Sequence, residues 1–167
     1  LGFFGQNAPA PLATGPIPAG EQVRAFLSSI APGFEGAVAV TCGFSLARGV
    51  ARQFGTTPEA YALGVDPILV DPPGTTAAPS TLLFKRVVSN AGFDTTYALF
   101  NHGVSTAQCV VDVRNRPNLP AVPLANITLG PGEFVANQLS DLGVPIQGFL
   151  TATCDQPDVY GSAHTLS

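Results

Sequence analysis

The chain repeats itself at a spacing of 112 residues. Residues 1–55 align with residues 113–167 without a gap, and 13 of the 55 positions are identical, where this composition alone would give about 4. The identical pairs are Pro11/Pro123, Leu12/Leu124, Ala13/Ala125, Gly20/Gly132, Glu21/Glu133, Val23/Val135, Leu27/Leu139, Ser28/Ser140, Gly36/Gly148, Thr41/Thr153, Cys42/Cys154, Gly49/Gly161 and Ala51/Ala163. We infer a duplicated unit, so one architecture must suit both copies.

The repeated segments have the pattern of β-strands and turns. In "GAVAVTC" the residues Val38, Val40 and Cys42 share one face by alternation, and "GFLTATC" repeats the pattern. "PAGEQVRAFLSSI" and "GPGEFVANQLSDL" each predict a Pro/Gly turn, a short strand through Val23 or Val135, and one helical turn. No longer helix is indicated, so the sequence predicts an all-β protein.

The second copy is preceded by a block that the first copy lacks. "TLLFKRVVSN", "DTTYALFNHG" and "STAQCVVDVRNRP" are three strand-like runs, and their counterparts would lie before residue 1. We therefore expect a partial β-sandwich unit over residues 1–72, a Pro/Thr-rich linker over 73–81, and a complete unit over 82–167. A chain that opens within a unit is also what clipping would produce, and we expect a mature, processed or partial chain.

The second copy contains the runs "GFDTTYALFNHGVSTAQCVVDV", "LGPGEFVANQLSDL", "IQGFLTATCDQP" and "VYGSAHTL". In these runs it resembles a repeat module of bacterial secreted and surface proteins. The resemblance covers residues 82–167 as a whole module and 1–55 as a partial one. It implies two tandem, related immunoglobulin-like antiparallel β-sandwich units, the first incomplete, used as a stalk or adhesive element. It carries no functional residue across.

Composition excludes several classes of function. Only 11% of residues are charged and the net charge is −4, so the chain lacks the basic stripe that nucleic-acid binding needs. No apolar run approaches the roughly 20 residues of a membrane span. The low Lys content and the cysteines in strand-like runs favour export. We expect a secreted or cell-surface bacterial protein with no nucleic-acid partner and no membrane span.

Three cysteines divide into a pair and a single residue. Cys109 and Cys154 both lie on inward faces by alternation, so they could form a disulfide bridging the two sheets; the alternative is a pair of buried thiols. Cys42 has no partner, because the counterpart of Cys109 would lie before residue 1. It is expected to be unpaired or intermolecular.

No residue pattern predicts catalysis or a cofactor. His102 and His164 lie in a turn and a strand without metal-ligand spacing, and we expect both to be solvated. Asp155 and Asp158 lack the ligand ladder of a calcium loop. Glycosidase-like carboxylate pairing among Glu21, Glu133, Asp94 and Asp112 is an open alternative, although the first two occupy the same place in both copies. Tyr and Phe side chains are expected in the core. We predict no enzyme, no metal and no cofactor.

The segment after the first copy carries apolar residues without a unit of their own. They are Tyr61, Leu63, Val65, Ile68, Leu69 and Val70. We expect residues 60–70 to add a strand to the first copy or to a neighbouring chain. The predicted function is therefore a self-assembling surface or filament subunit joined by β-strand complementation. The alternative is a non-catalytic module of a larger secreted protein that binds a ligand, namely a glycan.

Overall fold

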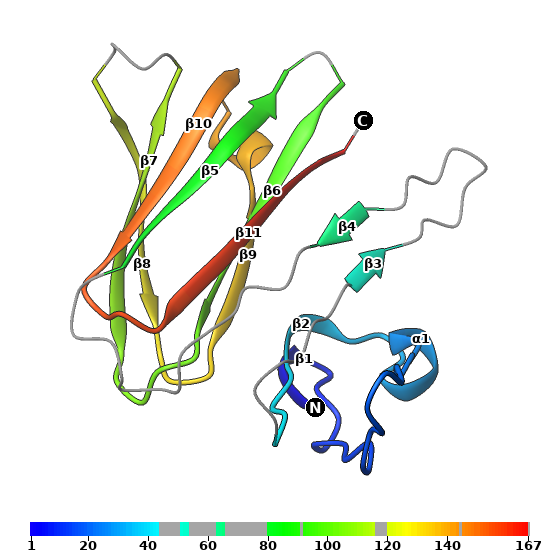
Figure 1. The fold of residues 1–167 in the computed structure, drawn as a ribbon. Coiled ribbons are helices and arrows are strands. Elements are labelled where there is room, and N and C mark those ends of the chain that lie inside the picture. The colour runs from blue at the N-terminus through cyan, green and yellow to red at the C-terminus, as the bar shows by residue number, and fades with distance from the viewer. Residues whose placement is uncertain are drawn as a thin grey trace.

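A computed structural model describes residues 1–43, 51–53, 63–65, 80–90, 92–115, 120–143 and 145–166. The described part is all-β, with antiparallel pairing in every sheet (Figure 1). Its helices are two single turns, α1 (Leu27–Ile30) and the 3₁₀ turn η1 (Leu139–Leu142). The all-β prediction is confirmed.

Seven strands form two sheets that face each other. The first sheet has the order β5 (Ser80–Ser89), β10 (Ile146–Cys154), β7 (Ala107–Arg114) and β8 (Val122–Leu129). The second has the order β11 (Val159–Leu166), β6 (Asp94–Asn101) and β9 (Phe134–Gln138). We call these strands and their connections the complete unit. It begins at Ser80, two residues inside the predicted linker.

The core lies between these sheets and follows the alternation of the sequence. Val87, Leu99, Val111 and Leu150 are fully buried and come from four different strands of the two sheets. Side chains of alternate residues point to one face of a strand, so each strand contributes every second residue to this layer. Gly161 leaves room for the Phe84 ring, whose Cζ would lie 2.8 Å from a Cβ at that position.

The strand order differs from that of an immunoglobulin constant domain. There the first strand shares a sheet with the second and fifth, and the last with the third and sixth. Here the first strand, β5, lies beside β10, the sixth, whereas the last, β11, lies beside β6, the second. The two terminal strands of the unit have therefore exchanged sheets, and the fourth strand, β8, lies with the third and sixth instead of with the second and fifth.

Edge strand β5 contains a bulge. Val87 pairs with Gly148 and Phe84 with Leu150, so Lys85 and Arg86 together oppose the single residue Phe149. Both basic side chains are exposed. A bulge and charged residues on an edge strand discourage pairing with another chain.

Two polar residues at the start of β6 tie the sheets together. The Thr95 hydroxyl donates to the Val88 carbonyl and accepts from the Val88 N–H, each at 2.9 Å, and it contacts the Thr165 hydroxyl at 2.6 Å. Asp94 accepts from the N–H and hydroxyl of Ser140, which anchors η1. These bonds satisfy polar groups near the connection that leads from β5 in one sheet to β6 in the other.

The first unit contains two separate strand pairs. Strand β1 (Gly2–Gln6) pairs with β2 (Glu35–Ala39), and β3 (Ala51–Gln53) pairs with β4 (Leu63–Val65). The predicted strand through Val23 is wrong, because residues 22–26 have no regular secondary structure, whereas Val135 lies in β9 as predicted.

Local features recur at the 112-residue spacing. Glu21 N–H donates to the Pro18 carbonyl and Glu133 N–H to the Gly130 carbonyl, both at 3.1 Å. The intervening Gly20 and Gly132 have φ of 82° and 73°, which favours glycine. Helical turns α1 and η1 also differ by 112 residues. Glu21 and Glu133 therefore hold equivalent turn positions.

Cys109 and Cys154 form a disulfide, as one of the two alternatives predicted. The expectation that it joins the two sheets is wrong. The cysteines lie directly opposite each other on neighbouring strands β7 and β10 of one sheet, with Cα atoms 4.0 Å apart. Alternation correctly placed both on the inward face, but two inward residues can belong to the same sheet.

Replacing Cys109 or Cys154 by Ser should lower the free energy of unfolding by about 2–5 kcal/mol, because the bridge closes a long loop of the unfolded chain. Denaturant unfolding of each variant measures the loss. The matched Cys42→Ser variant should unfold like the parent, because Cys42 makes no disulfide. Equal stability of all three variants would contradict a structural role for the bridge.

Candidate assembly site

The first unit exposes large apolar side chains. The exposed fractions are 51% for Val23, 45% for Leu27, 36% for Val38 and 65% for Val40. Within residues 1–43 the buried apolar side chains are Phe3 and Ala31, and Phe3 meets Phe34 edge to face with ring centroids 5.5 Å apart. This part of the chain therefore has very little core of its own.

These exposed residues correspond to buried residues of the complete unit. The counterparts of Leu27, Val38 and Val40 at the 112-residue spacing are Leu139, Leu150 and Ala152, each 0% exposed. The counterpart of Val23 is Val135, which packs against the core. We call Val23, Leu27, Val38 and Val40 the open face. It is a core-type surface without the layer that covers its counterpart.

The complete unit shows what covers such a surface. Turn η1, which carries Leu139, contacts β5 and β6, and β10, which carries Leu150 and Ala152, pairs with β5 along its length. Within the described residues, no strands equivalent to β5 and β6 precede β2. The open face is exposed because no described strand takes the places of β5 and β6 around it.

The linker supplies one strand at a matching position. In the complete unit Ala163 of β11 pairs with Tyr97 of β6, and in the first unit its counterpart Ala51 pairs with Val65 of β4. Both pairs are antiparallel. Strand β4 is therefore an antiparallel neighbour of β3, as β6 is of β11, within one chain. Of the predicted assembly residues, Leu63 and Val65 are in β4, whereas Ile68, Leu69 and Val70 lie outside the described residues, as does Tyr61.

Within the described residues strand β2 has one hydrogen-bonded partner strand, β1, and it also comes close to β9. Its counterpart β10 lies between β5 and β7, whereas β2 pairs with β1 alone. The edge of β2 that pairs with β1 corresponds to the edge of β10 that pairs with β7. A Cβ on Gly36 would collide with the Phe4 carbonyl oxygen of β1, and a Cβ on Gly148 would collide in the same way with the Arg114 carbonyl oxygen of β7. The edge of β2 that corresponds to the β5 side of β10 is therefore the one with which no described strand pairs.

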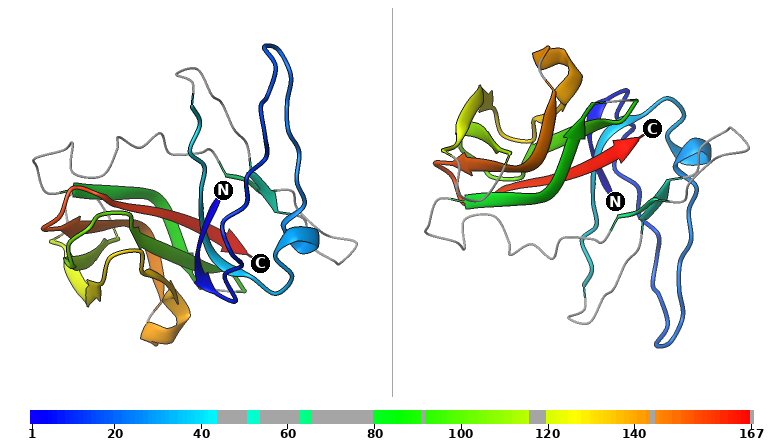
Figure 2. Two further views of the ribbon diagram at one scale, coloured as in Figure 1. Left: turned by 90° about the horizontal axis from the view of Figure 1, so that it is seen from below. Right: turned by 90° about the horizontal axis from the view of Figure 1, so that it is seen from above.

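An aromatic contact joins the first unit to the complete unit. The Phe4 ring lies 4.9 Å from the Phe100 ring and 6.5 Å from the His102 ring, centroid to centroid. A Cβ on Gly132 would be 3.4 Å from the same ring. Phe100 pairs in register with Tyr160 and Phe134, forming an aromatic row across β11, β6 and β9. Figure 2 shows the first unit beside the two sheets, not between them.

Sequence reasoning missed this aromatic contact. Alternation assigns Phe100 to the face opposite Leu99, but only the strand register shows that Tyr160 and Phe134 share its row. No sequence signal pointed to Phe4.

The titratable residues considered in the sequence have structural contacts. His102 differs from the solvated turn residue expected: its ring lies near Phe4, Phe100 and Tyr160, and its Nδ1 is buried without a hydrogen-bond partner. His164 is half-buried in β11. Asp155 accepts from the Gln108 N–H at 2.7 Å, and Glu133 accepts from the Gly130 N–H at 2.6 Å.

Other acidic and phenolic groups serve the fold. Asp158 is buried and its carbonyl accepts from the His102 N–H; Asp112 is half-buried in β7 and Glu21 is exposed. Burial raises the pKa of Tyr97, opposed by a weaker hydrogen bond from Asn137. Tyr97 is a core residue as expected, whereas Phe26 is 72% exposed. In the residues that the structure describes, no three His, Cys, Asp or Glu side chains gather closely enough to hold a metal ion.

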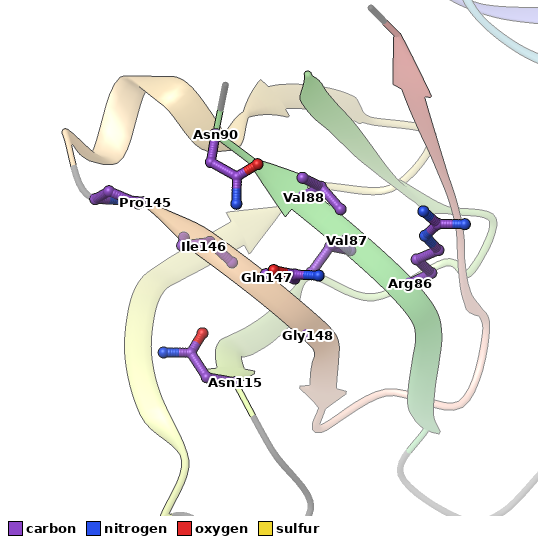
Figure 3. Close-up of a pocket in the computed structure, with 9 residues that line it drawn as sticks. All are labelled: Arg86, Val87, Val88, Asn90, Asn115, Pro145, Ile146, Gln147 and Gly148. Carbon is purple, nitrogen blue, oxygen red and sulfur yellow. The ribbon is translucent and has the colours of Figure 1, made fainter. Parts of the chain in front are cut away.

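A polar hollow of about 580 Å³ opens beside β5 and β10 (Figure 3). Its polar lining is one guanidinium and three amides, from Arg86, Asn90, Asn115 and Gln147. The remaining lining residues are Val87, Val88, Pro145, Ile146 and Gly148. These nine residues include no carboxylate for acid–base chemistry and no aromatic ring for stacking a sugar.

Cys42 is half-buried and makes no disulfide. It is the counterpart of Cys154 at the 112-residue spacing. None of the helices in the described ranges is long and apolar enough to cross a membrane.

Comparison of the chain with protein-family models, with curated proteins and with solved structures found no match.

The open face makes a matched pair of substitutions informative. Leu139→Ala should lower the free energy of unfolding by about 2–5 kcal/mol, because it empties a fully buried site. Leu27→Ala, at the equivalent but exposed position, should change it by less than about 1 kcal/mol. Denaturant unfolding at low protein concentration measures both. An equal loss in the two variants would show that the first unit has a closed core.

Proposed function

We propose that this chain is a non-catalytic structural subunit of the cell exterior, built of two related immunoglobulin-like units, that assembles into filaments by β-strand complementation. The observation that carries the proposal is the open face: Leu27, Val38 and Val40 are exposed where Leu139, Leu150 and Ala152 are fully buried. Large apolar side chains that are exposed where their counterparts are buried are candidates for an interaction site.

Strand complementation suits this surface. An added strand satisfies the free backbone groups along an edge and fills the gaps between apolar side chains. A contact between different surfaces of successive copies repeats without closing unless the rotation forms a ring. A filament is therefore the expected product.

The disulfide supports an exterior location. Cys109–Cys154 is a bond typical of oxidising compartments, and the resemblance to bacterial surface modules favours a bacterial cell surface.

Glycan binding is the second candidate, and the polar hollow favours it. Amides and a guanidinium are suitable partners for sugar hydroxyls, and Arg86, Asn115 and Gln147 supply them. The aromatic row is a weaker argument, because Phe4 packs against its central member, Phe100.

Charge on the open face should prevent assembly. The double variant Val38→Asp, Val40→Asp should remain monomeric at concentrations where the parent forms filaments, because a strand cannot cover two carboxylates without desolvating them. Light scattering and electron microscopy measure assembly, and the disulfide reports the folding of the complete unit.

Val104→Asp is the matched control, because Val104 is 81% exposed in the complete unit and lies outside the open face. It should assemble like the parent. Unchanged filaments from the double variant, or a parent that stays monomeric at high concentration, would contradict the proposed function.

A further inference from the structure

We propose that residues 68–70 of a second copy fill the strand position beside β2, in the register that residues 82–84 hold beside β10. This inference rests on the proposed function and names the segment and the pairing that join two copies. It takes the complete unit as the template for the incomplete one.

The template fixes which residues should face each other. Leu82 of β5 pairs with Ala152 and Phe84 pairs with Leu150. The 112-residue spacing converts these partners to Val40 and Val38. A strand beside β2 must therefore place one apolar residue opposite Val40 and another, two positions later, opposite Val38.

Residues 68–70 have the required pattern. In "DPILVDP" Ile68 and Val70 are two positions apart, like Leu82 and Phe84 in "TLLFKR". In an antiparallel pair Ile68 would face Val40 and Val70 would face Val38. Pro67 and Pro72 bound the run and limit it to a short strand on one edge, because proline has no N–H for the ladder.

Connection lengths favour a second copy as the donor. Strand β4 ends at Val65 and matches β6, which lies in the sheet opposite β5 and β10. In the complete unit each connection between the two sheets has at least four residues; the shortest are 90–93, 130–133 and 155–158. Only residues 66 and 67 separate β4 from the run, so the same chain has too short a link to place both strands.

Engineered cysteine pairs test the proposed register of residues 68–70 beside β2. Every protein in the experiment also carries Cys42→Ser, so that the native free cysteine cannot react. Proteins carrying Val38→Cys alone and Val70→Cys alone are mixed under assembly conditions and oxidised. We expect a covalent dimer containing one of each, because the predicted pair brings the two Cβ atoms within disulfide distance. Val38→Cys mixed with Leu69→Cys is the control: one step along a strand turns the side chain to the other face, so this mixture should give far less dimer.

The outcomes separate the inference from the proposed function. Mixed dimer from the first mixture supports the inference. If filaments form and neither mixture cross-links, the donor is wrong while the proposed function stands. A cross-link found only inside monomers of the Val38→Cys, Val70→Cys double variant shows that the run covers its own chain and overturns the inference. If no variant and no parent protein assembles, the proposed function fails.

Discussion

A strand that carries a core face needs a layer over that face, and a strand in the middle of a sheet also needs a neighbour on each edge. Strand β10 has both: β5 and β7 pair with its edges, and the second sheet covers Leu150 and Ala152. Strand β2 has the same alternation and one paired edge, with β1. The difference between the two copies follows from this deficit, because side chains at equivalent positions are core in one copy and surface in the other.

The same constraint decides which segments become strands. Residues 22–26 and β9 share the turn glycine before them and the helical turn after them, but only Phe134–Gln138 forms a strand. Strand β9 pairs over its full length with β6, whereas no strand of the described structure pairs with residues 22–26. A strand is defined by the hydrogen bonds to its neighbour, so a local pattern cannot form one alone.

Local features were therefore the predictable ones. The turns at Gly20 and Gly132, the helical turns that follow, and the inward position of Cys109 and Cys154 come from spacing and backbone preference. The sheet that holds each strand was not predictable, since alternation identifies a face but not a neighbour. The disulfide was for this reason expected between sheets and lies within one. The contact of Phe4 with Phe100 depends on how the units meet, which no local pattern records.

The central claim is that the open face is covered only when copies meet. Hydrogen–deuterium exchange of the backbone amides of residues 35–40, measured over a wide range of protein concentration, tests it most directly. The account predicts rapid exchange in dilute protein and strong protection after assembly, with β10 protected throughout because its partners are in the same chain. Protection of residues 35–40 that is already complete in dilute monomer would contradict it.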